Sequence, residues 1–300
     1  MSERSTIVVA GAAGFIGRRV VDRLARTETD VKALDRIGDP GGWPAGVDYR
    51  QVDLDREMPA FKGSWILVHL AWSLDRANAA AQQESLQTFA RLLGQENLAG
   101  VVGLGSDEEY GEREGCLRED QAPGAKLSAY GQAKHAAGKA LEAWARGAGR
   151  KAVWLRPFVV YGPGQGGNMA IPYALRCARE RTPGDFSEGL QFRDFVHVDD
   201  VADGIAAAAL AWPTLKPAFS VCNLGRGEPV RLRDVLERIA DQTNSRELFR
   251  FGARPLRPGE PQEQYADVAA AAERFGWRAK IPWQQGVDTM CREPGKNNHG

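Results

Sequence analysis

Short apolar runs alternate with longer helical segments along the first half of the chain. Runs at residues 7–10, 65–71 and 101–105 predict buried strands, and the segments 77–93 and 130–146 predict helices. Further short strands are predicted at 31–35, 47–54, 152–157 and 219–223. This alternation indicates right-handed βαβ units in a doubly wound parallel sheet, an α/β fold that binds ligands at the carboxyl ends of its strands.

From about Phe158 the alternation gives way to glycine- and proline-rich loops around short elements. This change predicts a second, smaller domain that holds a substrate. Within this half, residues 232–239 predict an amphipathic helix. Asp199 or Asp200 is the expected N-cap of an alanine-rich helix.

The composition is that of an ordinary globular protein, with 43% hydrophobic and 26% charged residues. Lys plus Arg and Asp plus Glu number 39 each, so no basic surplus indicates a nucleic-acid partner. The apolar runs are far shorter than the ~20 residues that cross a bilayer, and the N-terminus does not resemble a signal peptide. We therefore expect a cytoplasmic protein without a membrane partner. Scattered cysteines and histidines predict reduced thiols and no metal site.

The strand predicted at 7–10 runs directly into a glycine turn that precedes a helical pattern. Gly11, Gly14 and Gly17 form the spacing G-x-x-G-x-x-G, with Phe15 and Ile16 between the last two. Strand, glycine turn and helix together predict a dinucleotide site, because the helix N-terminus directs its dipole and unpaired N–H groups at a pyrophosphate. The spacing differs from G-x-G-x-x-G, so the fingerprint is met only in its general form.

The ends of the following strands supply the other candidate cofactor residues. Asp35 ends the second strand, where a carboxylate binds the adenine ribose hydroxyls and favours NAD. Arg36 beside it could accept the 2′-phosphate of NADP, so NADP stays open. Asp53 could meet the adenine amine or cap a turn. The remaining strand-end candidates are Leu54, Leu70, Ala71 and Pro157.

A polar cluster and a helix supply the candidate catalytic groups. Ser106 and Glu108 follow the strand at 101–105, where a polar loop is typical of a functional site. Tyr130 and Lys134 are four residues apart, so one helix face directs both at the same pocket.

These features together, with the runs Arg156-Pro157…Tyr161-Gly162-Pro163 and Arg193-Asp194-Phe195-Val196-His197-Val198-Asp199-Asp200, resemble the extended short-chain dehydrogenase/reductases. More narrowly, the chain resembles the NAD-dependent epimerase/dehydratase family, which acts on nucleotide sugars. The resemblance covers nearly the whole chain. It implies a Rossmann domain of residues 1–157 and 190–224, and a nucleotide-sugar lobe of residues 158–189 and 225–300. It also implies a homodimer joined through the helices at 77–93 and 130–146.

The resemblance assigns roles to individual residues. Tyr130 matches the catalytic tyrosine, Lys134 its lysine partner, and Ser106 the serine or threonine before the loop tyrosine. An ammonium ~6 Å from the phenol would favour the phenolate by roughly 3 kcal/mol, or ~2 pKa units. Asn168 resembles a nucleotide-diphosphate contact, and the Arg193 and Arg257 guanidinium groups match arginines that hold the pyrophosphate. Asp199 and Asp200 are expected to be structural.

Family reactions begin with redox at a sugar carbon, usually C4, and then diverge. An epimerase returns the hydride after the keto sugar has rotated, a ketoreductase only delivers hydride, and a 4,6-dehydratase removes the C5 proton and the C6 hydroxyl. The loop Ser106-Asp107-Glu108 resembles the Thr-Asp-Glu of dehydratases. A glutamate at the position of Glu108 also occurs in 4-ketoreductases, however. In addition, 300 residues is short for a dehydratase. We predict a 4-epimerase, with the 4-ketoreductase and then the dehydratase as alternatives. A non-catalytic dinucleotide-binding scaffold is disfavoured because Tyr130 and Lys134 are both present.

Overall fold

A seven-stranded parallel sheet forms the centre of the computed structural model, which describes residues 6–147, 149–167, 169–216, 218–256 and 259–292. The strands lie in the order β3, β2, β1, β4, β5, β7, β12. Their bounds are β1 Thr6–Ala10, β2 Asp30–Asp35, β3 Asp48–Gln51, β4 Trp65–His69, β5 Leu98–Leu104, β7 Lys151–Pro157 and β12 Phe219–Leu224. The chain winds outward from β1 in both directions, so the strand order reverses between β1 and β4, where such sheets bind ligands. The predicted α/β doubly wound fold is confirmed.

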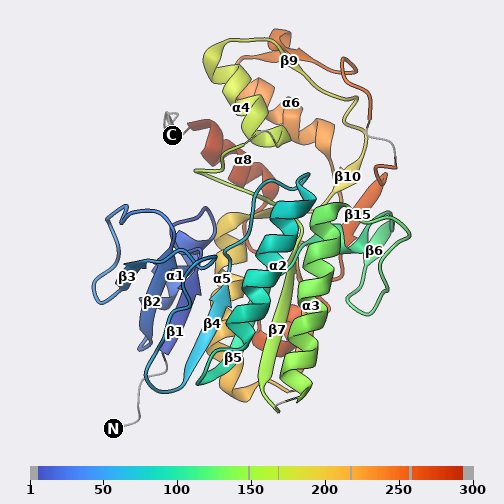
Figure 1. Cartoon of the computed structure of the whole chain (residues 1–300). Helices are drawn as coiled ribbons and strands as arrows, with labels where there is room; N and C mark the ends of the chain where they lie inside the picture. Colours follow the sequence, from blue (N-terminus) through green and yellow to red (C-terminus); the bar gives the residue numbers. More distant parts are fainter. Residues whose placement is uncertain (1–5, 148, 168, 217, 257–258, 293–300) are drawn as a thin grey trace.

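Two layers of helices cover the sheet (Figure 1). On one face lie α2 (Ala79–Leu93) and α3 (Ala129–Gly147), and on the other lie α1 (Gly17–Leu24), α5 (Val198–Ala211) and α7 (Ala269–Phe275). Successive β-strand side chains point to opposite faces. In β1, Ile7 and Val9 pack into the core with α1 and α5, whereas Val8 and Ala10 pack into the core with α2 and α3. This alternation explains why strands buried on both faces are apolar throughout.

Several predicted boundaries shift by a few residues. The strand expected at 65–71 ends at His69, and the one expected at 47–54 is the shorter β3. The N-cap prediction for α5 is wrong, because His197 caps this helix by accepting the backbone N–H of Asp199 at 3.2 Å. Asp200 instead turns inward and accepts the backbone N–H groups of Lys280 and Ile281.

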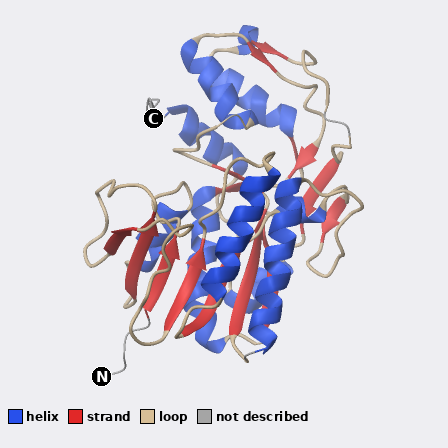
Figure 2. Cartoon of the chain, in the orientation of Figure 1, coloured by secondary structure: helices blue, strands red, loops and turns tan. Residues whose placement is uncertain are grey.

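A second lobe stands above the carboxyl ends of the sheet strands (Figure 2). Its core lies between α4 (Ala170–Glu180), α6 (Leu232–Gln242) and α8 (Trp283–Arg292). Three small sheets accompany the lobe. β13 (Val230–Arg231), β10 (Phe192–Arg193), β15 (Glu263–Ala266) and β6 (Gly115–Leu117) form one, and β11 (Phe195–His197) pairs with β8 (Val159–Tyr161) in another. The third, β14 (Phe249–Arg250) with β9 (Gly184–Asp185), lies at the outer end of the lobe (Figure 1). The single-turn 3-10 helices are η1 (Asp107–Tyr110), η2 (Trp212–Thr214) and η3 (Arg246–Leu248).

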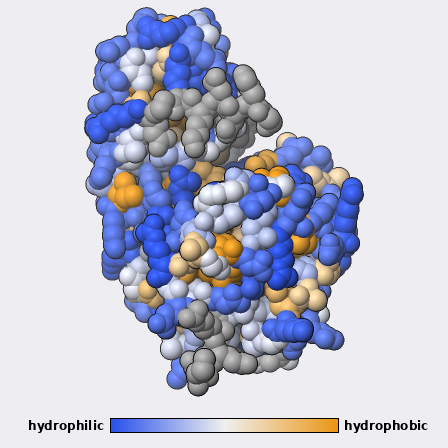
Figure 3. Space-filling view, turned by 90° about the vertical axis from the view of Figure 1, so that its left-hand side faces the viewer, coloured by the Kyte–Doolittle hydropathy of each residue, from blue (hydrophilic) through white to orange (hydrophobic). Residues whose placement is uncertain are grey.

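The division of the chain into domains at residues 157, 190 and 224 stays a prediction. One element beyond residue 225 belongs spatially to the sheet: Ala271 of α7 and Trp277 after it pack into the core beneath α1 and α5. Seen from the side of β3, the molecule consists of an upper and a lower mass, both covered mainly by hydrophilic side chains (Figure 3). Among the helices of the described residues, none combines the length and apolarity needed to cross a membrane.

Candidate active site

The glycine turn after β1 is built so tightly that side chains would not fit. Gly11 has a φ of +81°, and a Cβ on it would lie 2.7 Å from the backbone nitrogen of Ala71. A Cβ on Gly17 would lie 2.0 Å from the carbonyl oxygen of Gly11. Both positions require glycine, because real Cβ atoms do not approach backbone so closely. The turn thereby brings the start of α1 close to the end of β4.

Two donors at the start of α1 are free to bind an anion. Ile16 is the N-cap residue and gives no side-chain cap. Within the described part of the chain, the backbone N–H groups of Phe15 and Ile16 have no hydrogen-bond acceptor. Unpaired N–H groups at a helix N-terminus are favourable partners for phosphate oxygens. The turn therefore fits the pyrophosphate of a dinucleotide.

Three of the predicted cofactor residues, Asp35, Leu70 and Ala71, contact this turn. Asp35 ends β2, and its Oδ2 accepts the backbone N–H of Ala13 at 2.9 Å, which fixes the carboxylate beside the glycine loop. Arg36 is exposed next to it. The remaining candidates lie at or just beyond strand ends. Asp53 forms an ion pair with Arg56, and Leu54 follows it. Leu70 and Ala71 lie against Gly11, and Pro157 ends β7.

Ser106 lies directly beyond β5 and begins η1. Its hydroxyl donates to Asp107 at 2.9 Å and accepts the backbone N–H of Glu108 at 3.2 Å. Its own backbone N–H donates to Oε1 of Glu109 at 3.0 Å, which completes a capping box. The Ser106 side chain is therefore fixed on both sides at the carboxyl edge of the sheet.

Glu109 is a buried anchor that the sequence interpretation did not identify. Its carboxylate also accepts Trp154 Nε1 at 2.9 Å and pairs with Arg156 Nε at 3.0 Å. Both Glu109 and Arg156 are buried. Two donors of β7 thus fasten η1 to that strand. The sequence signal was weak, because the second of two adjacent glutamates in a loop usually faces solvent.

Tyr130 and Lys134 lie on the first turns of α3, as the spacing predicts. Gly131 permits the close approach of α3 to η1, because a Cβ there would lie 2.5 Å from the carbonyl oxygen of Glu108. Lys134 Nζ lies 5.6 Å from the centroid of the Tyr130 ring and donates to the carbonyl oxygen of Leu104 at 2.7 Å. The tertiary structure therefore brings Tyr130, Lys134 and the loop of Ser106 to the end of β5.

Burial dominates the ionisation of this pair. It raises the pKa of Tyr130 to about 12, although the Arg76 guanidinium acts in the opposite direction. It lowers the pKa of Lys134 to about 7, against the attraction of Glu109. The Tyr130 pKa is therefore raised and not lowered as expected from a neighbouring ammonium, because desolvation of the buried phenol and the carboxylates of η1 outweigh the Arg76 charge.

A second cation, Arg76, stands at the same site and was not anticipated. It lies between β4 and α2, with its guanidinium carbon 4.5 Å from the centroid of the Tyr130 ring. Its Nη1 lies 2.5 Å from Oε1 of Glu108. A lone arginine in a loop carries no sequence signal for such a contact. Burial raises the pKa of the neighbouring Asp107 to about 6, with the Glu108 charge adding to the effect.

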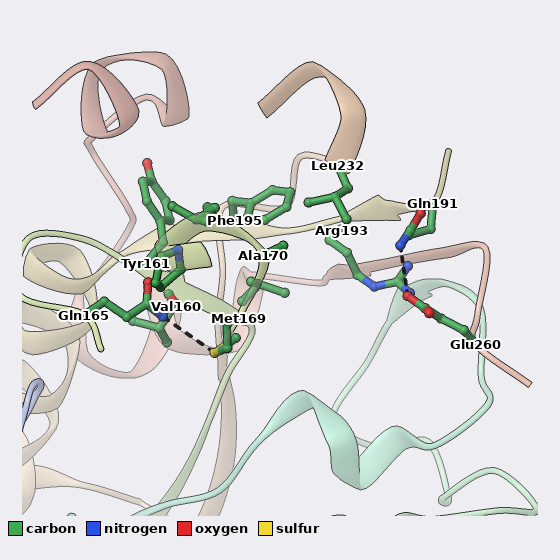
Figure 4. A pocket seen from close by; sticks show the side chains of 13 residues that line it. Val160, Tyr161, Gln165, Met169, Ala170, Gln191, Arg193, Phe195, Leu232 and Glu260 are labelled. Carbon is green, nitrogen blue, oxygen red and sulfur yellow. Dashed lines mark hydrogen bonds and ion pairs between the residues drawn. The ribbon is translucent and has the colours of Figure 1, made fainter. Parts of the chain in front are cut away.

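A cavity of about 110 Å³ is lined by residues of β8, β10, β11 and the start of α4 (Figure 4). At one end, Arg193 Nη2 and Gln191 Nε2 both donate to Oε1 of Glu260 at 3.0 Å. The Oε1 atoms of Gln191 and of Gln165, at the other end, are buried without a partner among the described residues. Unpaired buried acceptors indicate a place for a polar ligand. Of the predicted substrate contacts, Arg193 lines this cavity, whereas Asn168 and Arg257 lie outside the described residues.

Asp199 has a structural role, as expected. Asp199 pairs with Arg19 and Arg23 of α1, which ties α5 to the glycine-turn helix. In the described residues, no group of three His, Cys, Asp or Glu side chains could hold a metal ion.

The chain is similar in sequence and in fold to known proteins. A sequence profile of the NAD dependent epimerase/dehydratase family matches residues 7–225. The putative UDP-glucose 4-epimerase of Methanocaldococcus jannaschii is 26% identical, covering 97% of this chain and 99% of its own. The UDP-glucuronate 4-epimerase of Thermodesulfobacterium geofontis is 25% identical and covers 93% of each chain. Among solved structures, MoeE5 in complex with UDP-glucuronic acid and NAD has a TM-score of 0.78 at 26% identity, covering 96% of this chain and 98% of that one.

The fold and the glycine turn define a dinucleotide-binding α/β enzyme with a separate lobe. The chain belongs to the NAD dependent epimerase/dehydratase family.

Proposed function

We propose that the chain is an NAD-dependent 4-epimerase of a nucleotide sugar, with a UDP-hexose as the first substrate to test. The observation that carries the proposal is the meeting of Tyr130, Lys134 and Ser106 at the end of β5, beside the glycine turn. The relatives named as 4-epimerases of UDP-glucose and UDP-glucuronate support the reaction class.

The cofactor would lie across the carboxyl ends of β1 and β4. The free N–H groups of Phe15 and Ile16 would hold its pyrophosphate, and Asp35 its adenine ribose. When bound, NAD would take up a hydride from the sugar carbon and return it.

The chain's own residues would move the proton and hold the sugar. The Tyr130 phenolate oxygen would take the proton of the sugar hydroxyl, and the resulting phenol would later give it back, with Ser106 Oγ hydrogen-bonded to the same sugar oxygen. Lys134 would hold the nicotinamide ribose and add positive charge near the phenol. Because a tyrosine with a pKa of about 12 is a poor base at neutral pH, phenolate formation requires positive charge beside the ring.

The cavity lined by Arg193 would bind the nucleotide diphosphate. Arg193 would exchange its contact with Glu260 for a phosphate oxygen, since its guanidinium already faces the cavity. Asn168 and Arg257 are proposed as further contacts on the basis of sequence resemblance only.

We further propose a homodimer joined through α2 and α3, which pack side by side on one sheet face. On this face α2 exposes Gln83, Gln87 and Ala90. Light scattering coupled to size exclusion tests this state, and Ala90→Arg would convert the dimer to a monomer. A cytoplasmic location also stays a prediction, and it agrees with the free state of the four cysteines.

The decisive experiment incubates the protein with NAD and UDP-glucose and measures the products by mass and by NMR. A 4-epimerase gives a C4 epimer of unchanged mass. Loss of water would establish a 4,6-dehydratase, and gain of two hydrogens on a 4-keto sugar would establish a ketoreductase. Absence of turnover with UDP-glucose, UDP-glucuronate and UDP-N-acetylglucosamine, together with NAD binding, would instead support a scaffold.

Solvent deuterium separates epimerisation from dehydration independently. A 4-epimerase breaks no carbon–hydrogen bond except the one exchanged with the cofactor, so product formed in D₂O carries no carbon-bound deuterium. Glu108→Gln would then cost no more than about tenfold in turnover, or roughly 1.4 kcal/mol. Carbon-bound deuterium that disappears in Glu108→Gln would favour dehydration.

A further inference from the structure

The loop between β4 and α2 holds an arginine over the candidate catalytic tyrosine. The guanidinium carbon of Arg76 lies 4.5 Å from the ring centroid of Tyr130, and its Nη1 lies 2.5 Å from Oε1 of Glu108. Arg76 has 47% of its side chain accessible; burial of the remainder opposes its charge, but the neighbouring Tyr130, Glu108 and Asp107 outweigh burial and raise the pKa of the guanidinium. One side chain therefore links the ring of Tyr130 to the carboxylate of Glu108.

This loop is fixed by a buried side chain of α2. Gln82 is 1% exposed; its Oε1 accepts Trp72 Nε1 at 2.7 Å, and its Nε2 donates to the carbonyl oxygen of Asp75 at 2.8 Å. Asn78 caps α2 two residues after Arg76 by accepting the N–H groups of Ala80 and Ala81. The backbone on either side of Arg76 is thus pinned, and this reduces the conformational entropy lost when the arginine adopts its position.

Glu108 is held from the opposite side. Its Oε2 accepts the hydroxyl of Ser128, just before α3, at 2.5 Å. Each carboxylate oxygen of Glu108 therefore has a donor, one from Arg76 and one from Ser128. A carboxylate engaged in this way is better suited to hold the arginine than to remove a proton from carbon.

The charges that face Tyr130 give Arg76 a specific effect. Three carboxylates of η1, Asp107, Glu108 and Glu109, disfavour the phenolate, and Arg76 opposes them. Lys134 is turned partly away, with its Nζ bonded to Leu104 and 3.8 Å from the centroid of the Trp72 ring. Arginine keeps its charge at all physiological pH values, whereas burial lowers the pKa of Lys134 to about 7.

We propose that Arg76 is a positioning residue for proton transfer by Tyr130, and that Glu108 serves to hold Arg76 over the ring. The fixed positive charge favours the phenolate and so prepares the base. The proposal rests on the assignment of Tyr130 as the base in the proposed function. It adds a residue from a third element, the β4–α2 loop, to the group formed by η1 and α3.

The test measures the tyrosinate form of Tyr130 directly. Ultraviolet difference absorbance of the NAD-loaded protein, with Tyr130→Phe as the blank, reports its fraction at a fixed alkaline pH at which circular dichroism shows an intact fold. We expect Arg76→Met to reduce this fraction about tenfold, because one charge near the ring is lost at a partly solvated site. In sugar turnover, the acid limb of the pH profile of kcat should move upward by about one pH unit.

Glu108→Gln distinguishes a charge effect from a structural one. Glutamine keeps an acceptor for Arg76 but removes a negative charge, so the tyrosinate fraction should rise, opposite to Arg76→Met. The matched control is Arg146→Met, which removes an exposed arginine from the far end of α3 and should change nothing. Three results would each overturn the proposal. They are equal tyrosinate fractions in the wild type and Arg76→Met, a change of the fraction in the same direction in Arg76→Met and Glu108→Gln, and no tyrosinate in the wild type. A normal tyrosinate response without sugar turnover would leave Arg76 in this role and reject the proposed function.

Discussion

The Nε of Arg156 lies 3.0 Å from Oε2 of Glu109, and both side chains are buried beneath the loop that carries Ser106. The pair joins β7 to η1 across the carboxyl edge of the sheet. Because the other oxygen of Glu109 accepts the backbone N–H of Ser106, the same carboxylate fixes the fold and the position of a candidate catalytic hydroxyl.

Glu109→Gln should therefore lower both stability and turnover. The substitution leaves the Arg156 charge buried without its partner, a change that costs about 3–5 kcal/mol. Denaturant unfolding monitored by circular dichroism gives the difference in the free energy of unfolding. Glu247→Gln is the matched control, since the Arg181–Glu247 pair is exposed and should contribute less than about 1 kcal/mol. Equal effects of the two variants would contradict the importance of burial.

Tyr130→Phe should remove most turnover and leave NAD affinity nearly unchanged, because only the hydroxyl that transfers the proton is lost. General acid–base catalysis contributes typically 10²-fold or more, so residual activity above about a tenth would exclude Tyr130 as the base. Lys134→Ala should reduce both turnover and NAD affinity. Steady-state kinetics and calorimetric titration with NAD measure the two quantities separately.

The protein should bind NAD more tightly than NADP, because the Asp35 carboxylate repels a 2′-phosphate. Asp35→Asn removes this repulsion beside Arg36, so NADP should bind more tightly relative to NAD. The dissociation constant of NADP divided by that of NAD should fall by about tenfold. Asp39→Asn is a suitable control, since Asp39 accepts the backbone N–H of Gly41 in the same loop. Tighter binding of NADP by the wild type would give Arg36 the deciding role.

The stability of the sheet domain should decrease in acid through His69. This side chain is 1% exposed, its Nε2 has no partner among the described residues, and burial lowers its pKa to about 3. Because the unfolded chain takes up the proton near pH 6.5 and the folded chain only near pH 3, the free energy of unfolding falls as the pH drops through this window. The full effect is on the order of 4 kcal/mol.

His69→Phe keeps a ring beside Phe89 but cannot be protonated. Its free energy of unfolding should vary less between pH 7 and pH 4 than that of the wild type, by roughly 2 to 3 kcal/mol. Urea unfolding curves at several pH values test this. Parallel pH dependences of the two proteins would show that other groups cause the loss.

The sequence determined the features that depend on local geometry. Apolar runs of strand length, separated by helical segments, specify β1, β4 and β5 with α2 and α3, because the two periodicities of 2 and 3.6 residues are properties of neighbouring residues. The glycine turn follows from backbone conformations that other residues do not adopt, as at Gly11. The placement of Tyr130 and Lys134 on one face also follows from helical spacing.

Only the tertiary structure decided which distant groups meet. Glu109 contacts Arg156, Arg76 covers Tyr130, and Arg193 pairs with Glu260 because parallel strands and two lobes bring separate loops to one edge. Whether the pKa of Tyr130 is raised or lowered likewise depends on the tertiary structure. Spacing indicated a nearby ammonium, but the depth of burial and the carboxylates of η1 raise the pKa. Desolvation depends on all the surrounding atoms, and no short stretch of sequence specifies it.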